Sequence, residues 1–229
     1  MSFRLTIPGL AFSLSTRPLK AFFFGMHAET DALFRLVRRE TLTLFYSRSG
    51  LGKTSLLQAG LFPRLREANL LPVPIRLDYG PKAPSLLSQV KQAVANVLTE
   101  AGTDVRPPTE GESLWEYFHH SDVDFWDAQN RLVTLVLVFD QFEERFTLGR
   151  QFADTDAQAE VCLTELSQLV ENRPPRLLKT KFEAQADGVG SYDFDKHSCK
   201  VILSLREDFL PERNRASQLF CHRRSRPPA

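Results

Sequence analysis

Residues 41–61 read TLTLFYSRSGLGKTSLLQAGL, and this stretch decides the fold class. Its opening, Thr41–Tyr46, is rich in β-prone residues and predicts a strand. Residues 47–52 are mostly small and include two glycines, which is typical of a loop. Leucines then recur on one face of a helix, at positions 56, 57 and 61, and we expect Pro63 to end that helix. A strand, a glycine-containing loop and a helix in this order predict an anion-binding turn.

The loop carries most of the P-loop pattern G-x-x-x-x-G-K-[ST], although Ser47 stands where the first glycine belongs. In this pattern backbone N–H groups surround phosphates, the lysine reaches the β- and γ-phosphate oxygens, and the hydroxyl binds Mg²⁺. The alternative is an ordinary glycine-rich turn with a solvated lysine, but the strand before and the helix after favour the phosphate site. We therefore predict phosphate contacts from one run of residues: Ser49, Gly50, Leu51, Gly52, Lys53, Thr54 and Ser55.

A second signal follows the apolar run Leu132–Phe139, which is typical of a strand buried on both faces of a parallel sheet. The run ends at Asp140, where a Mg²⁺-linked Walker B aspartate belongs. A surface acid that merely ends the strand is the alternative. Glu143 and Glu144 come next, and either could polarise the attacking water or be an ordinary first-turn helix acid. Spacing alone does not separate these two roles.

A third signal is Arg206, which directly follows the expected strand Val201–Leu205. A cation at the carboxyl edge of the sheet could sense the γ-phosphate. A solvated arginine that pairs with Glu207 or Asp208 is equally consistent with the sequence.

The remaining segments alternate between helices and strands, which predicts an α/β fold with a largely parallel sheet. We expect Leu132–Phe139 and Val201–Leu205 to be interior strands that flank Thr41–Tyr46. Periodicity and composition predict further elements: helices at His27–Arg39, Ser85–Leu98 and Val161–Val170, and a strand at Val73–Asp78. Residues 101–130 resist assignment, and 172–200 look like a loop or insertion.

Composition limits the possible partners and compartments. A formal charge of +1 provides no general attraction to nucleic acid or to anionic membranes. No apolar run is long enough to span a bilayer. The three cysteines are odd in number and lack metal-ligand spacing: Cys162, Cys199 and Cys221. The five histidines form no pattern of metal ligands. We expect a cytoplasmic protein without a structural metal, membrane segment or direct nucleic-acid contact.

Several motifs in one order resemble the signal-transduction ATPases called STAND proteins, in particular the novel STAND subclass of bacterial multidomain regulators. The resemblance runs from about Pro18 to Pro211. Its motifs are Phe23–Gly25 with Glu29, SGLGKTSLLQAGLFPRL, Ile75–Tyr79, Leu114–Phe118, Val138–Glu144 and Leu203–Phe209.

The resemblance implies an additional-strand ATPase fold, ATP or ADP rather than guanine nucleotides, and a Mg²⁺-dependent switch. It matches Lys53 and Thr54 to the Walker A pair, Asp140 to Walker B and Arg206 to a sensor arginine, and it places Gly25 near the base. Met26 departs from the family, which generally has arginine there.

The expected organisation is an irregular arm at 1–20, the NTPase domain at 21–211 and a basic disordered tail at 212–229. Family members continue into further modules, so we expect a fragment, a truncated product or a shortened relative. The expected function is an ATP-binding switch that hydrolyses ATP slowly and acts through a homo-oligomer or downstream signalling modules. The alternative is a degenerate nucleotide-binding or scaffold domain without catalysis.

Overall fold

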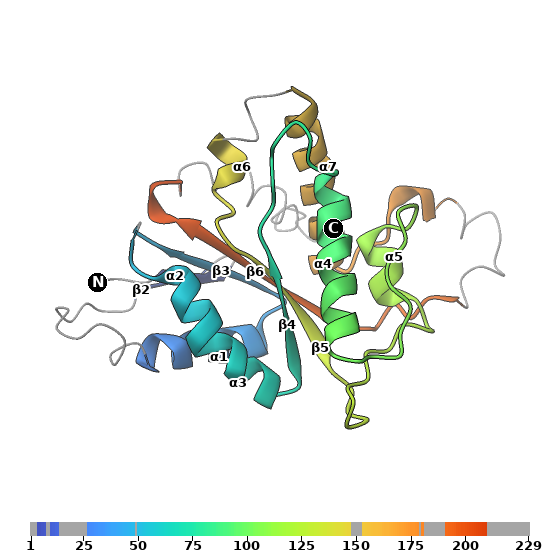
Figure 1. The fold of residues 1–229 in the computed structure, drawn as a ribbon, viewed down its shortest axis with the longest axis horizontal. Coiled ribbons are helices and arrows are strands. Elements are labelled where there is room, and N and C mark those ends of the chain that lie inside the picture. Colours follow the sequence, from blue (N-terminus) through green and yellow to red (C-terminus); the bar gives the residue numbers. More distant parts are fainter. Residues whose placement is uncertain are drawn as a thin grey trace, which may run out of the picture.

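The computed structural model describes residues 4–7, 10–13, 27–48, 50–147, 153–178, 180 and 191–209. Within them, six strands form one sheet in the order β2-β1-β3-β6-β5-β4 (Figure 1). The strands are β1 Arg4–Ile7, β2 Leu10–Ser13, β3 Leu42–Ser47, β4 Leu70–Ile75, β5 Thr134–Phe139 and β6 Cys199–Arg206. β3, β6, β5 and β4 run parallel, whereas β1 is antiparallel to β2 and β3. The predicted α/β fold with a largely parallel sheet is confirmed.

The helical segments are α1 His27–Arg39, α2 Lys53–Ser55, the π-helical η1 Leu56–Leu61, α3 Phe62–Glu67, α4 Leu86–Glu100, α5 Leu114–His119, α6 Glu144–Thr147, α7 Ala153–Val170 and the 3-10 turn η3 Glu207–Phe209. They cover both faces of the sheet. One core joins α4, α5 and α7 to the sheet, and the other joins α1, η1 and α3 to its opposite face (Figure 1).

β5 shows why an unbroken apolar run marks an interior strand. Leu135, Leu137 and Phe139 pack in the core beneath α4, α5 and α7, while Val136 and Val138 pack in the core beneath α1 and η1. Successive side chains of a strand point to opposite faces, so a strand covered on both faces needs apolar residues throughout.

The strand order corrects one expectation. Val201–Leu205 lies in β6, which pairs directly with β3, but β5 is one strand further away. β6 therefore lies between the loop strand and the acid-bearing strand. Because all three are parallel, their carboxyl ends meet at one edge, where Ser47 is in register with Arg206.

The predicted helix stop at Pro63 is wrong. Helical structure continues from Lys53 to Glu67 through α2, η1 and α3, and Pro63 lies in the first turn of α3. The preceding turns are π-helical, and the N–H of Phe62 donates to the Leu57 carbonyl. Proline is tolerated at this position because a helical segment does not require its first N–H groups for internal bonds.

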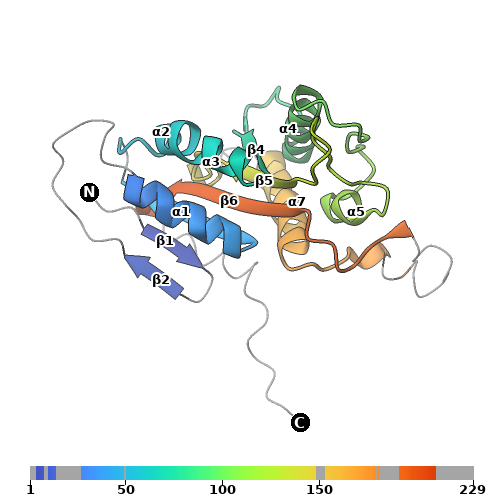
Figure 2. The same ribbon diagram turned by 90° about the horizontal axis from the view of Figure 1, so that it is seen from below.

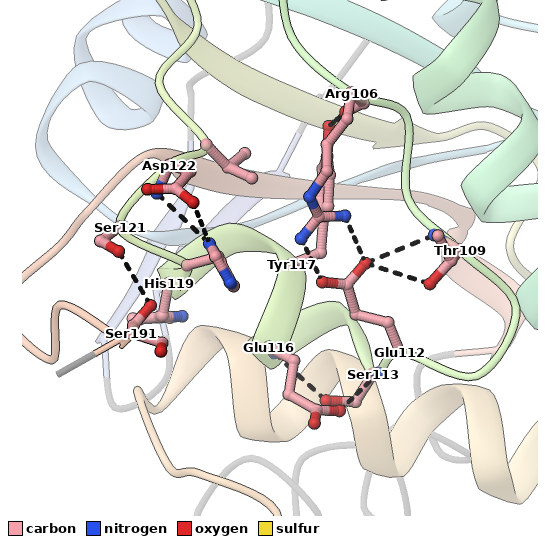
Figure 3. Close-up of polar contacts among 12 residues, drawn as sticks. Arg106, Thr109, Glu112, Ser113, Glu116, Tyr117, His119, Ser121, Asp122 and Ser191 are labelled. Atoms are coloured by element: carbon pink, nitrogen blue, oxygen red, sulfur yellow. Dashed lines mark hydrogen bonds and ion pairs between the residues drawn. The ribbon is translucent and has the colours of Figure 1, made fainter. Parts of the chain in front are cut away.

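Residues 101–130, which the sequence left unassigned, contain α5. Ser113 caps this helix by accepting from the N–H of Glu116, and the Glu116 carboxylate accepts from the N–H of Ser113 (Figure 3). The Ser-x-x-Glu spacing was the available signal for a helix start. Arg106 and Glu112 pair in the preceding loop, with 2.6 Å between Nη2 and Oε1.

Other boundaries also differ from the predictions. β4 starts at Leu70 and ends at Ile75, and it tolerates Pro72 and Pro74 because it is an edge strand. α7 begins at Ala153, well before the expected start. The predicted irregular arm contains β1 and β2 (Figure 2). They form there because the outer edge of β3 supplies backbone groups with which β1 pairs. The described helices include none that is both long and apolar enough to cross a bilayer.

Candidate nucleotide-binding site

The loop between β3 and α2 has the backbone conformation that its glycines allow. Gly50 and Gly52 have φ values of 76° and 75°, in the left-handed region that side chains with a Cβ rarely adopt. Gly52 precedes α2, so the first N–H groups of the helical segment 53–67 open toward the loop. Ser47, at the position of the missing first glycine, is fully buried as the last residue of β3.

Lys53 projects from the first helical residue into buried surroundings. Its side chain lies 3.4 Å from the Ser47 carbonyl oxygen, measured from Nζ, and the residue is 9% exposed. Burial lowers the pKa of Lys53, and the charges of Glu143 and Asp140 partly offset that effect. A cation in poorly solvated surroundings binds an anion more strongly than a solvated cation does.

Asp140 is the centre of a hydrogen-bond network. Its Oδ2 accepts from the Thr54 hydroxyl at 2.6 Å, and its Oδ1 accepts from the Ser204 hydroxyl at 3.1 Å. The Gln141 N–H also donates to Oδ1, at 3.0 Å. A hydroxyl and a carboxylate in contact are hard oxygen donors of the kind that hold Mg²⁺ together with substrate phosphates and water. No cluster of three or more His, Cys, Asp or Glu side chains suited to a metal occurs among the described residues.

A cavity of about 390 Å³ lies over the loop and the carboxyl edge of the sheet. Its volume falls within the range of small-molecule sites. It brings together loop, strand-end and turn residues: Gly50, Leu51, Gly52, Lys53, Thr54, Asp140, Gln141, Glu143, Glu144 and Arg206. Of the predicted site residues, Ser55 is exposed and is not part of this lining, while Ser49 and Gly25 lie outside the described residues.

The sequence prediction missed Ser204 and Gln141. Ser204 is fully buried in β6, where its hydroxyl donates to Asp140 and its carbonyl oxygen accepts from the Phe142 N–H at 2.9 Å. A single serine inside the apolar run VILSL was the available signal, because a buried hydroxyl needs a partner. Gln141 carried no comparable signal in the sequence.

Glu143 and Glu144 occupy different surroundings. Glu143 is 7% exposed, and burial raises the pKa of its carboxyl group. Glu144 pairs with Arg76 from the end of β4, with 3.1 Å between Oε1 and Nη2. Both residues line the cavity.

Arg206 ends β6 and lines the same cavity. Its Nη2 lies 2.7 Å from Oδ2 of Asp208, so the ion pair considered as an alternative is present. Glu207 lies near Arg48 of the loop, at 3.8 Å. Arg206 therefore both lines the cavity and pairs with Asp208.

The sequence was compared with models of known protein families. The model for Novel STAND NTPase 1 matches residues 12–225. The chain belongs to this family. As a Novel STAND NTPase 1 domain, it has the α/β sheet expected of an NTPase, and the family supports nucleotide binding. A search of curated proteins found no match.

Proposed function

We propose that this domain binds ATP and ADP with Mg²⁺ in the cavity over the β3–α2 loop. The observation that carries the proposal is the meeting of Lys53, Thr54 and Asp140 in one cavity. Lys53 would contact the β- and γ-phosphates, and Thr54 and Asp140 would hold Mg²⁺, which would neutralise phosphate charge. The loop residues Ser49 and Leu51 and, nearer the base, Gly25 complete the proposed contacts. ATP rather than GTP follows from the STAND resemblance.

Lys53→Ala tests this binding proposal. Removing the charge should cost about 2–3 kcal/mol or more of binding free energy, as charged hydrogen bonds do. Calorimetric titration of Mg·ATP and Mg·ADP into both proteins gives the affinities. Lys82→Ala is the matched control, because Lys82 is exposed on another loop. Equal ATP affinity in the wild type and Lys53→Ala would contradict the proposal.

We further propose slow ATP hydrolysis. Glu143 and Glu144 are the candidate carboxylates for the attacking water, and Arg206 is the candidate γ-phosphate sensor. Among the described residues that line the cavity, the cations are Lys53 and Arg206. An arginine supplied by another molecule can raise phosphoryl-transfer rates by roughly 10³–10⁵. Single-turnover hydrolysis with excess protein tests this part, and turnover of several per second would contradict it.

The proposed biological role is a cytoplasmic regulatory switch, in which nucleotide state controls self-association or contact with signalling modules. Light scattering with ADP and with a non-hydrolysable ATP analogue measures self-association directly. The competing proposal is a degenerate scaffold that does not hydrolyse ATP. Ser47 gives no reason to prefer the scaffold, because the position of the replaced glycine is buried at the end of β3.

A further inference from the structure

A left-handed turn directly after Asp140 changes the direction of the chain. Gln141 has a φ of 56°, a conformation that is uncommon for residues other than glycine. Its N–H donates to Asp140 Oδ1 at 3.0 Å, and the next N–H, of Phe142, donates to the Ser204 carbonyl oxygen at 2.9 Å. The second of these bonds fastens the turn to β6. The residues after β5 therefore fold back along the sheet edge, and Glu143 and Glu144 both reach the cavity.

The carboxyl group of Glu143 is buried and incompletely hydrogen-bonded. It is 7% exposed, and its Oε2 is buried without a hydrogen-bond partner in the described part of the chain. The Lys53 ammonium and the backbone N–H groups of Glu143 and Arg206 lower the carboxyl pKa, but burial outweighs them and the pKa is raised. A buried carboxylate oxygen without a partner is costly unless a water molecule or ligand completes it.

Glu144 has a partner already. Its Oε1 lies 3.1 Å from Nη2 of Arg76, and 25% of its side chain is exposed. Glu144 also starts α6, where an acid is favoured by the helix dipole. These contacts account for Glu144 without any role in catalysis.

Resting on the proposed ATPase function, we infer that Glu143 orients the attacking water, and that the left-handed turn at Gln141 positions it there. The water donates a hydrogen bond to Glu143 Oε2 and attacks the γ-phosphorus atom. The bond from that phosphorus to the bridging oxygen breaks, and ADP leaves with the electron pair. The water proton passes to the Glu143 carboxylate and then to the phosphate, so ATP and water become ADP and phosphate.

A different role for Glu143 would be that of a buried counter-ion for Lys53. The two roles predict opposite effects on binding. If Glu143 only holds Lys53 in place, its neutralisation should weaken nucleotide binding. If Glu143 orients water, neutralisation should leave nucleotide affinity unchanged or increase it, because a negative charge beside the phosphates is removed.

Single-turnover hydrolysis by the wild type, Glu143→Gln, Glu144→Gln and Glu100→Gln tests the inference. Glu143→Gln should lower the rate by roughly 10²-fold or more, as loss of a general base does. Glu144→Gln should have a much smaller effect. Glu100, exposed at the end of α4, is the matched control. Equal losses in Glu143→Gln and Glu144→Gln, or a loss confined to Glu144→Gln, would overturn the inference.

Trapping of ADP with aluminium fluoride provides a readout that needs no turnover. The wild type should trap the complex, whereas Glu143→Gln should bind ADP but fail to trap it. Wild-type protein that binds ADP but neither hydrolyses ATP nor traps the complex would overturn the inference while leaving nucleotide binding intact. Wild-type protein that binds no nucleotide would instead refute the proposed function.

Two substitutions of Gln141 test the positioning role. Glycine adopts the left-handed conformation freely, whereas a β-branched side chain is strained in it. Gln141→Gly should therefore hydrolyse ATP and trap ADP with aluminium fluoride far better than Gln141→Val. The two variants should have similar ADP affinity. Equal hydrolysis and trapping in these two variants would show that the turn does not position Glu143.

Discussion

The hydroxyl of Thr54 lies 2.6 Å from Oδ2 of Asp140, although the two residues are 86 positions apart in the chain. This bond joins the start of the loop helix to the end of β5, across the intervening strand β6. A metal ion that binds both oxygens would replace the hydrogen bond that now joins them. The bond therefore marks where metal and nucleotide binding are expected to be coupled.

Thr54→Ala and Asp140→Asn should weaken the dependence of ATP binding on Mg²⁺. Each change removes one of the two oxygens proposed to hold the metal. Titration of Mg²⁺ at fixed ATP, followed by calorimetry, measures the effect. Thr99→Ala is a suitable control, because the Thr99 hydroxyl donates within its own helix, to the Ala95 carbonyl oxygen. Unchanged metal titrations in both site variants would refute the assigned metal ligands.

Asp208→Asn should strengthen ATP binding by about two- to fivefold, which corresponds to an exposed ion pair of about 0.4–1 kcal/mol. Asp208 pairs with Arg206, and its carboxylate would compete with the γ-phosphate for that cation. ADP affinity should change less, because ADP lacks the γ-phosphate. Asp104→Asn, at an exposed loop position, is the control. A larger gain for ADP than for ATP would contradict this competition.

Gly60→Ala should destabilise the fold by about 1–3 kcal/mol, the usual cost of overpacking. A Cβ at position 60 would lie 2.8 Å from Oγ1 of Thr30, where α1 packs on η1. Urea unfolding gives the free energy of unfolding, and Gly111→Ala is the control, because a Cβ there meets nothing within 4 Å. Adding Thr30→Ala should recover part of the loss. Additive effects of the two changes would show that this contact is not the cause.

Stability should fall as the pH drops below about 6.5, partly because of His119. Burial lowers the pKa of His119, and its ring stacks on Trp115 at a centroid distance of 4.3 Å. Nδ1 lies 2.9 Å from the Trp115 carbonyl oxygen, which suits a neutral ring that donates from Nδ1 (Figure 3 labels His119). Below its ordinary pKa of 6.5 the unfolded histidine binds a proton that the folded one does not, so acid favours unfolding.

His119→Phe is the test of that pH dependence, because phenylalanine keeps the aromatic stack but cannot titrate. The variant should show a flatter decline of unfolding free energy between pH 7.5 and 5, whatever its absolute stability. Identical slopes in the wild type and the variant would show that His119 does not contribute.

Much of the fold could be predicted because the signals were local. The β3–loop–helix order follows from residue types within 41–61, and the double burial of β5 is visible as an unbroken apolar run. Helix α1 was predicted with its bounds, His27–Arg39, from spacing alone. Lys53, Thr54 and Asp140, which line one cavity, could be selected from the sequence because the P-loop pattern places a lysine and a hydroxyl residue at the start of a helix, and a buried strand ends at an acid.

The tertiary structure decided everything that depended on which segments meet. Only the sheet shows that β6 separates β3 from β5, since strand order is set by packing between distant segments. The tertiary structure also distinguishes Glu143 from its neighbour Glu144, through the turn at Gln141 and the bond from the Phe142 N–H to the Ser204 carbonyl oxygen. The sequence places those two carboxylates side by side with the same chemistry. Their different surroundings arise from Lys53 and Arg206 near Glu143 and from Arg76, which follows β4, near Glu144. No local pattern encodes these contacts.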